Sequence, residues 1–420
     1  MLLRFCPNPE QGWFRSLPLS LTSRSRTVQL MCMRTLRNAF IPALLLALFA
    51  NFALAQEAVT PQPAAPSTPA RSTVQLVQKE FYAPAPGANP PGLDVLEVYF
   101  NVPGKHPLAV LTHGTSDDPL VRAHVTPWGQ QSQAQWFARR GYVVFVVVRQ
   151  GYGRSGGKQD SSKGGCNAHG SFTEAGEASA ADLGAIMRYA ATLPEVDANT
   201  IVSVGVSTGG FAQVALSADP PPGVKAAISF AGGRGGDGHE HNCDLSSVIG
   251  AFGSYGKSAH KHGDLPMLWI YSQNDHWFTP AMAGKFEEAY TKTGATNQFV
   301  MAPPDGDDGH HLYAHVAAWS DTVEAFLKAH NLLPLGDTLL PEPQVPNLPM
   351  PPGLQAKDEE TWKRFLLAAP YKALVLDDSG KLWIGAAGFD QNLADESAKD
   401  RCKKGGGNRC EIVARTPGVK

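Results

Sequence analysis

The segment from Ile201 to Leu216 constrains the fold of this chain more than any other. Its first half is an apolar run rich in β-branched residues, typical of a strand buried on both faces, and its second half has the composition of a helix. The pattern Gly205-Val206-Ser207-Thr208-Gly209 joins the two halves. A G-x-S-x-G pattern between a strand and a helix indicates a sharp turn that lifts a serine hydroxyl above the sheet edge. We therefore expect Ser207 to be a nucleophile, with a buried structural serine as the alternative.

A second match to the same pattern occurs at Gly153-Arg154-Ser155-Gly156-Gly157. It follows the strand-like run Tyr142 to Val148, but the residues after it favour no helix. Because a nucleophile turn requires a helix directly after the serine, Ser155 is expected to have no catalytic role.

Residues 33–55 have the order of a secretory signal peptide, with arginines first, then an apolar core, then small residues. The core runs from Ala39 to Leu54 and is too short for a comfortable membrane span. Ala53-Leu54-Ala55 supplies small residues, and cleavage is expected before Gln56. We therefore expect a mature protein in the bacterial periplasm or outside the cell. A retained membrane anchor is the alternative.

The residues before Met33 carry no strand or helix pattern. Translation is expected to start at Met31 or Met33, which makes residues 1–30 an extension of the gene model. Loss of the 1–55 leader removes six of 36 Lys and Arg and one of 38 Asp and Glu, which leaves 30 against 37 and a formal charge of −7. These mixed charges predict no basic patch, so no nucleic-acid partner is expected.

Four cysteines remain after the leader is removed: Cys166, Cys243, Cys402 and Cys410. An even number in an exported protein suggests two disulfides, because oxidising compartments favour them. Cys402 and Cys410 enclose a short local loop and are expected to pair, which leaves Cys166 to pair with Cys243. Free thiols in a cytosolic protein are the alternative.

Strand-like and helix-like segments alternate after a Pro-, Ala- and Ser-rich linker at residues 56–73. The expected strands are a pair that begins at Val74 and Leu93, then His106–Leu111, Tyr142–Val148, Ile201–Val206, Val224–Phe230, Pro266–Ser272 and Gln298–Ala302. The expected helices are Gln131–Arg140, Glu174–Leu193, the segment after Ser207, Ala281–Thr291 and Leu312–His330. The first strand pair is typical of an antiparallel arrangement. The later alternation predicts a mostly parallel central sheet with helices on both faces and catalytic groups at the strand carboxyl ends.

A serine hydroxyl becomes a good nucleophile when a base takes its proton, and a carboxylate best orients that base. Asp275 follows the second strand after the serine strand and is expected to be this acid. Its alternative role is to cap the helix beyond Pro280. Asp264 precedes the same strand and therefore lies at the wrong end of the sheet.

The base is expected just after the last strand, where two histidines are adjacent. We favour His310 over His311 because the flexible Gly309 precedes it, which is the usual setting of a catalytic imidazole. Ser207, Asp275 and His310 then follow one another in the order known for one class of hydrolases.

Charge that develops on a carbonyl oxygen needs preorganised donors, commonly backbone N–H groups. The Thr208 N–H, directly after the nucleophile, is one expected donor. The other is expected from the loop after Leu111, where we favour Thr115, with Gly114 second. His113 in this loop is expected to be structural rather than a second base.

The motifs that carry a family resemblance are His113-Gly114, Arg149-Gln150-Gly151-Tyr152-Gly153-Arg154-Ser155, Gly205-Val206-Ser207-Thr208-Gly209, Asn274-Asp275 and Asp308-Gly309-His310. In this spacing the chain resembles the α/β-hydrolase superfamily over roughly residues 74–333. It is most similar to secreted bacterial serine hydrolases of the dienelactone-hydrolase-like and acyl-peptidase-like kinds. The resemblance implies an α/β-hydrolase fold and a Ser-Asp-His enzyme that acts on carboxylic esters through an acyl-enzyme. Dienelactone hydrolase itself has a cysteine nucleophile, so its substrate is not carried over.

The Gly- and His-rich segment 232–264 is expected to be a lid loop, because such folds often insert a cap there. A bridge between Cys166 and Cys243 would fasten this lid beside the pocket. Four histidines form closely spaced pairs in the segment: His239, His241, His260 and His262. Without a strong Cys and His framework, a solvated lid is favoured over a metal site.

Residues 334–355 are proline-rich and indicate a second linker, which is followed by a small α+β module at 356–420. The module resembles small repeat-like domains on exported bacterial proteins and holds no catalytic constellation. The sequence therefore predicts an exported serine ester hydrolase with its catalytic domain at 74–333, a small-molecule ester substrate, and no cofactor or metal. A peptidase or acyl-aminoacyl hydrolase with the same residues, and a non-catalytic binding protein of this fold, are the alternatives.

Overall fold

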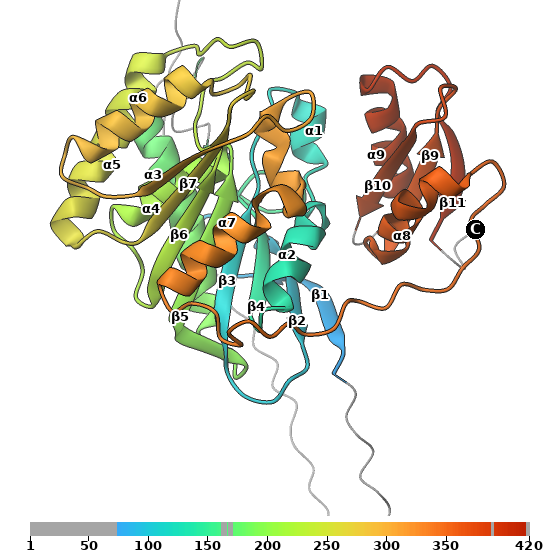
Figure 1. Ribbon diagram of the computed structural model, residues 1–420, viewed down its shortest axis with the longest axis horizontal. Helices are drawn as coiled ribbons and strands as arrows, with labels where there is room; N and C mark the ends of the chain where they lie inside the picture. Colours follow the sequence, from blue (N-terminus) through green and yellow to red (C-terminus); the bar gives the residue numbers. More distant parts are fainter. Residues whose placement is uncertain (1–73, 161–165, 167–170, 388–389, 417–420) are drawn as a thin grey trace, which may run out of the picture. The chain divides into compact units, whose positions relative to one another are not determined.

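An eight-stranded sheet forms the centre of the chain, with the strand order β1-β2-β4-β3-β5-β6-β7-β8 (Figure 1). The computed structural model describes residues 74–160, 166, 171–387 and 390–416. The predicted leader and first linker, residues 1–73, lie outside the described residues. The strands are β1 (Leu76–Ala83), β2 (Leu93–Phe100), β3 (His106–Thr112), β4 (Val143–Val148), β5 (Val196–Val206), β6 (Val224–Phe230), β7 (Met267–Ser272) and β8 (Gln298–Ala302).

The pairing of the strands confirms the predicted sheet. β1 and β2 are antiparallel, β2 and β4 are antiparallel, and the strands from β4 to β8 in sheet order are all parallel. Every residue of β4 is buried, as expected when helices cover both faces of a parallel sheet. The predicted α/β-hydrolase architecture is therefore the observed one.

Helices cover the two faces of the sheet. α2 (Gln131–Ala138) and α7 (Val316–Ala329) pack on one face, around Trp136 and Trp319. α3 (Phe172–Ala190), α4 (Thr208–Ser217), α5 (Leu245–His262) and α6 (Pro280–Thr291) contribute to the hydrophobic core on the other face. None of the helices in the described part of the chain combines the length and the apolar character that crossing a membrane requires.

The prediction of a lid loop over 232–264 is wrong for most of that segment, because Leu245–His262 forms the helix α5. Its buried side chains recur with a helical period: Val248, Ala251, Phe252, Tyr255 and Ala259. Phe252 stacks on Phe286 of α6 at a ring-centroid distance of 4.6 Å. Gly250, Gly253, Gly256, His260 and His262 therefore lie on a helix that packs on α6, and only the part of the segment before α5 remains beside the site.

The closing helix also differs from its prediction. Residues Gly309–Ala314 form a 3₁₀ helix, η3, and the α-helix α7 begins only at Val316. Two short elements were not predicted: α1 (Pro119–Ala123) and the 3₁₀ helix η1 (Pro127–Gln130). Each begins with a proline behind a capping side chain, Asp118 and Thr126, so local turn chemistry explains both starts.

The C-terminal module is a three-stranded antiparallel sheet with the order β10-β9-β11, together with two α-helices. Its elements are the 3₁₀ helix η4 (Ala356–Asp358), α8 (Glu359–Leu367), β9 (Tyr371–Leu376), β10 (Leu382–Ala387), α9 (Gln391–Lys404) and β11 (Glu411–Arg415). The small α+β module is therefore confirmed, although the sequence pattern does not predict β11.

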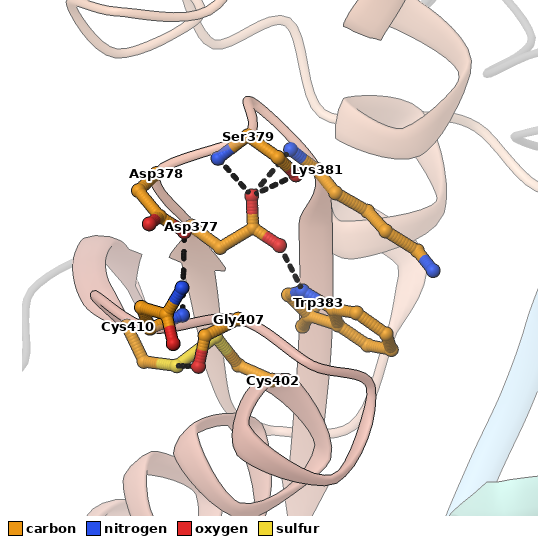
Figure 2. Close-up of a disulfide and its surroundings, with 9 residues drawn as sticks. Asp377, Asp378, Ser379, Lys381, Trp383, Cys402, Gly407 and Cys410 are labelled. Atoms are coloured by element: carbon orange, nitrogen blue, oxygen red, sulfur yellow. Dashed lines mark hydrogen bonds between the residues drawn. A yellow bond between two sulfur atoms is a disulfide. The ribbon is translucent and has the colours of Figure 1, made fainter.

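A disulfide and a carboxylate hold one end of this module (Figure 2). Cys402 of α9 is bonded to Cys410, which precedes β11, as predicted. Asp377 accepts hydrogen bonds from three residues of the β9-β10 turn and β10: Ser379, Lys381 and Trp383. The Ser379 hydroxyl and these N–H donors lower the pKa of the Asp377 carboxyl to about 2. The turn is thus built around an ionised side chain.

Two glycines of α5 provide a matched test of its packing. A Cβ atom on Gly256 would lie 2.5 Å from the Tyr290 carbonyl oxygen of α6, whereas a Cβ atom on Gly250 would meet nothing within 4 Å. We expect Gly256→Ala to lower the free energy of unfolding by about 1–3 kcal/mol through overpacking. Gly250→Ala is expected to raise the free energy of unfolding by about 0.5–1 kcal/mol, because alanine has a higher helix propensity than glycine and this position is exposed.

Urea unfolding of both variants measures these changes. Equal, small effects of the two substitutions would contradict a packed α5 and favour a loose loop.

Candidate active site

The turn between β5 and α4 holds Ser207 in a strained conformation, with φ 56° and ψ −121°. A positive φ is uncommon for a residue with a side chain and is typical of sites where surrounding contacts compensate the strain. The Ser207 N–H donates to the Phe230 carbonyl of β6 at 2.9 Å, and its carbonyl accepts from Phe211 at 2.9 Å. The side chain is 8% exposed. The serine thus lies at the carboxyl edge of the sheet.

Glycines make this turn possible because three backbone segments meet there. A Cβ atom on Gly205 would lie 2.2 Å from the Gly209 carbonyl oxygen, and one on Gly209 would lie 2.5 Å from the His113 carbonyl oxygen. A Cβ atom on Gly114 would lie 2.9 Å from the Ser207 Cβ. The loop after β3 therefore runs directly against the serine.

Asp275 and His310 are brought together as the sequence predicts. The Nδ1 atom of His310 lies 3.1 and 3.2 Å from the two carboxylate oxygens of Asp275. Both residues are buried, Asp275 at 1% and His310 at 9% exposure. Asp275 follows β7, and His310 belongs to η3 after β8. Parallel strands bring these two loops to the same edge of the sheet.

The carboxylate of Asp275 is itself fixed by backbone donors. Its Oδ1 accepts from the N–H groups of Trp277 and Phe278, each at 2.8 Å. The N-cap of α6 is Thr279, so the alternative of Asp275 as the cap of that helix does not hold. The carboxylate instead caps its own turn and contacts the imidazole.

Aromatic rings enclose the imidazole of His310. Trp277 stacks on it at a centroid distance of 5.3 Å and an interplanar angle of 26°, and Phe278 contacts it edge-on at 5.5 Å. The neighbouring His311 is 67% exposed, and its Nδ1 lies 4.0 Å from Asp308. Of the two adjacent histidines, His310 is therefore the one that is buried and held by a carboxylate.

A cavity of about 660 Å³ opens beside Ser207. It is lined by Thr115, Ser116, Asp117, Arg122, Cys166, Phe172, Ser207, Thr208, Arg234, Gly235, Gly236, Asp237, His241, Cys243, Trp277 and Phe278. Trp277 and Phe278 thus contact the cavity as well as His310. Within the described residues, no hydrogen bond joins the Ser207 hydroxyl to the His310 ring. Ser207 and the two aromatic residues that enclose His310 line the same cavity.

The two residues expected to stabilise an oxyanion, Thr115 and Thr208, both line this cavity. Among the described residues, no carbonyl accepts from the Thr115 N–H. The Thr115 hydroxyl lies 2.9 Å from the Tyr152 hydroxyl, and the Thr208 hydroxyl accepts from Arg149 at 2.9 Å. Each predicted donor is therefore anchored through its side chain.

Ser155, in the second G-x-S-x-G match, has a structural role. Its hydroxyl donates to the Val148 carbonyl at 2.6 Å and accepts from the Asp94 N–H at 2.9 Å. No α-helix follows it before residue 160. The first bond joins the turn to the end of β4, and the second joins it to the neighbouring strand β2.

Cys166 and Cys243 form the predicted disulfide, with a Cα separation of 5.6 Å. Both cysteines line the cavity beside Ser207. The bridge therefore joins the segment before α5 to Cys166, which precedes α3 in the chain.

The four histidines considered for a metal site lie apart in two structural settings. His239 and His241 belong to the segment before α5, where their N–H groups donate to Asp237. His260 and His262 belong to the last turn of α5. The described part of the chain contains no group of three or more residues suited to hold a metal ion.

Sequence reasoning missed several residues that shape this site, above all Arg149, Asp160 and Trp277. Arg149 lies within a motif that carries the family resemblance, and Trp277 lies two residues after Asp275, so position along the chain was an available signal. Asp160 lies in a loop without periodicity, and no pattern marks it.

An eight-stranded α/β sheet with a strained serine turn and a buried Asp-His pair defines an α/β-hydrolase. Residues 127–330 match the model of the dienelactone hydrolase family. This similarity supports a hydrolase activity.

Solved structures include two esterases with similarity to this chain. The esterase Pf2001 of Pyrococcus furiosus is 15% identical, with a TM-score of 0.42, over 60% of this chain and 93% of its own. The esterase Est2 of Thermogutta terrifontis, solved with butyrate, is 16% identical, with a TM-score of 0.42, over 61% of this chain and 95% of its own. None of the curated proteins matches the chain.

His113 contributes to the site as a neutral, structural residue. Its Nδ1 lies 2.6 Å from the Gly114 carbonyl oxygen, and its Nε2 accepts from the Arg149 N–H at 3.0 Å. Desolvation and the nearby Arg149 charge lower the pKa of the His113 ring to about 3. The ring then carries its proton on Nδ1, so it has no free base nitrogen for catalysis.

The lowered pKa of His113 predicts an acid-sensitive fold. Below about pH 6.5 the His113 ring of the unfolded chain binds a proton. In the folded chain the same ring stays neutral down to about pH 3. Stability is therefore expected to fall with pH across this window, by at most about 1.4 kcal/mol per pH unit from this group. Above the window, His113 adds no pH dependence.

Urea unfolding between pH 7 and pH 4 measures this slope in the wild type and in His113→Asn, which does not titrate there. We expect the variant to be less stable at pH 7 but to have a shallower slope. Parallel curves for the two proteins would contradict a neutral His113.

Proposed function

We propose that this protein is an exported serine hydrolase that cleaves carboxylic esters through an acyl-enzyme. Ser207 is the nucleophile, His310 the base and Asp275 the acid that orients the base. The observation that carries the proposal is the strained turn of Ser207 at a cavity whose aromatic wall also encloses the buried Asp275-His310 pair. Strain at a non-glycine residue is typical of functional sites.

The reaction follows from these positions. The Ser207 Oγ attacks the ester carbonyl carbon while the Nε2 of His310 takes the hydroxyl proton. The Asp275 carboxylate accepts from Nδ1 and stabilises the imidazolium. The N–H groups of Thr208 and Thr115 stabilise the negative oxygen of the tetrahedral intermediate.

Collapse of the intermediate completes the acylation. His310 gives its proton to the leaving alcohol, and the acyl group remains on Ser207. A water molecule then attacks the acyl-enzyme with His310 again as base, which releases the carboxylic acid and restores the serine. These steps need no cofactor.

Export is supported by the two disulfides, Cys166 to Cys243 and Cys402 to Cys410. Disulfides persist in oxidising compartments such as the periplasm. The signal-peptide pattern at residues 33–55 agrees with this compartment.

A fluorophosphonate probe tests the nucleophile, because it labels activated serines. We expect the mature wild-type protein to be labelled and Ser207→Ala to lose the label completely. Ser155→Ala is the matched control, since it removes the serine of the other G-x-S-x-G match and is expected to keep the label. Label that persists in a folded Ser207→Ala protein would refute the proposal.

A substrate comparison tests the bond that is cleaved. We expect hydrolysis of p-nitrophenyl esters to exceed that of aminoacyl anilides in kcat/KM. The reverse order would make the protein a peptidase, and no turnover or label with either class would make it a binding protein.

The adjacent histidines provide a test of the base. His310→Gln is expected to lower kcat by about 10⁴-fold, because the loss of a triad member leaves only binding and oxyanion stabilisation. His311→Gln, with the same chemical change at an exposed neighbour, is expected to keep kcat within about twofold. Ester hydrolysis under saturating substrate measures both, and a loss confined to His311→Gln would reverse the assignment.

A further inference from the structure

We propose that Arg149 and Tyr152, both held by the buried Asp160, are the positioning residues of the oxyanion hole. This inference rests on the proposed function and names the groups that give its N–H donors their direction. Neither residue contacts the substrate in this role. They act through the loop after β3 and through Thr208.

The Arg149 guanidinium is the centre of this arrangement, and its side chain is fully buried. It follows β4 and reaches both sides of the predicted hole. Its Nη1 donates to the Thr112 hydroxyl at 3.0 Å and to the His113 carbonyl, and its Nη2 donates to the Thr208 hydroxyl at 2.9 Å. One rigid, planar group thus joins the loop after β3 to the first residue of α4.

The orientation of one peptide plane explains the effect on catalysis. The Gly114 carbonyl oxygen lies 2.6 Å from the His113 Nδ1 and 3.4 Å from the Arg149 Nη2. In a planar trans peptide the following N–H points opposite to the carbonyl. Fixing the Gly114 carbonyl toward Arg149 therefore points the Thr115 N–H away from Arg149.

Tyr152 holds the side chain of the same residue. Its hydroxyl lies 2.9 Å from the Thr115 hydroxyl and donates to the Asp160 Oδ1 at 2.9 Å. Since Tyr152 must donate to the carboxylate, the Thr115 hydroxyl is the donor in the other bond. Thr115 is thus fixed through both its preceding carbonyl and its side chain.

Asp160 supplies the charge that allows two arginines to be buried here. Its carboxylate pairs with Arg234 and lies 3.4 Å from the Arg149 Nε, and the Ser179 hydroxyl donates to it at 2.5 Å. Burial alone would raise the pKa of Asp160, but the Arg234 and Arg149 charges outweigh it and hold the pKa below its ordinary value. The carboxylate stays ionised across the working pH range.

We expect this buried network to preorganise the N–H donors of the oxyanion hole. Donors that are already aimed at the developing oxyanion need no reorganisation during the reaction, and this is where much of enzymatic rate enhancement arises. Loss of the anchors is therefore expected to lower kcat and to leave ground-state binding, and hence KM, nearly unchanged.

Tyr152→Phe removes the hydroxyl that bonds Thr115 and Asp160, and it is the smallest change that tests this interaction. We expect kcat for a p-nitrophenyl ester to fall by about 10-fold, less than the 10²- to 10³-fold typical for loss of a whole oxyanion donor, with KM within about twofold. Tyr290→Phe is the matched control, because this buried tyrosine hydroxyl bonds only Ser217 and Met267 among the described residues. Its kcat is expected to equal that of the wild type.

A double-mutant cycle with Thr115→Val tests whether Tyr152 acts on kcat through Thr115. If it does, the Tyr152→Phe/Thr115→Val protein loses no more kcat than the worse single variant. Losses that multiply would overturn this step of the proposal. Equal kcat in Tyr152→Phe and Tyr290→Phe would overturn it as well.

The hydrogen bond from Arg149 to Thr208 is tested by changing its acceptor, Thr208. Substitution of the buried arginine itself risks misfolding. Thr208→Val removes the hydroxyl that accepts from Arg149, and Thr208→Ser keeps it. We expect about a 10-fold loss of kcat in the first and near-complete rescue in the second. Equal activity of the two variants would overturn the role of Arg149.

The wild type separates failure of this inference from failure of the proposed function. A wild-type protein with neither ester hydrolysis nor fluorophosphonate label refutes the function, and this inference with it. An active, labelled wild type whose kcat is insensitive to these substitutions refutes the positioning role alone.

Discussion

The site depends on one strained residue, Ser207, whose positive φ is imposed by the close approach of three backbone segments. β5 delivers the chain to the turn, α4 leaves it, and the loop after β3 closes over it. Each approach is tight enough to exclude a Cβ atom on the neighbouring glycine. The strain is offset by the packing of the sheet and helices around it, so the geometry of this turn depends on the core.

Two separate polar systems converge on that serine. On one side, the buried Asp275-His310 pair is oriented by backbone N–H groups and enclosed by Trp277 and Phe278. On the other, the Arg149-Asp160 pair holds the loop after β3 and the start of α4. A buried charge is costly unless it is paired and hydrogen-bonded, and both systems meet that condition.

Much of the fold and part of the site were predictable from the sequence. The strands are apolar runs with clear ends, and the order Ser207, Asp275, His310 follows from which strand each residue succeeds. α5 was missed because its glycines and histidines indicate a loop, although the spacing of Val248, Phe252 and Tyr255 is helical. The prediction followed the composition of the segment rather than its helical spacing. The segment folds as a helix because its apolar face packs on α6.

By itself, the sequence determined the parallel sheet, the turn at Ser207, the pairing of its four later cysteines and the preference for His310. These follow from hydrophobic runs, from glycines at a turn, from the number of cysteines and from order along the chain. Only the tertiary structure decided that Arg149, Tyr152 and Asp160 form a hydrogen-bonded group beside the loop after β3 and that Trp277 stacks on the imidazole. Those contacts join residues from different strands and loops, and their geometry arises only when the sheet brings the loops to one edge.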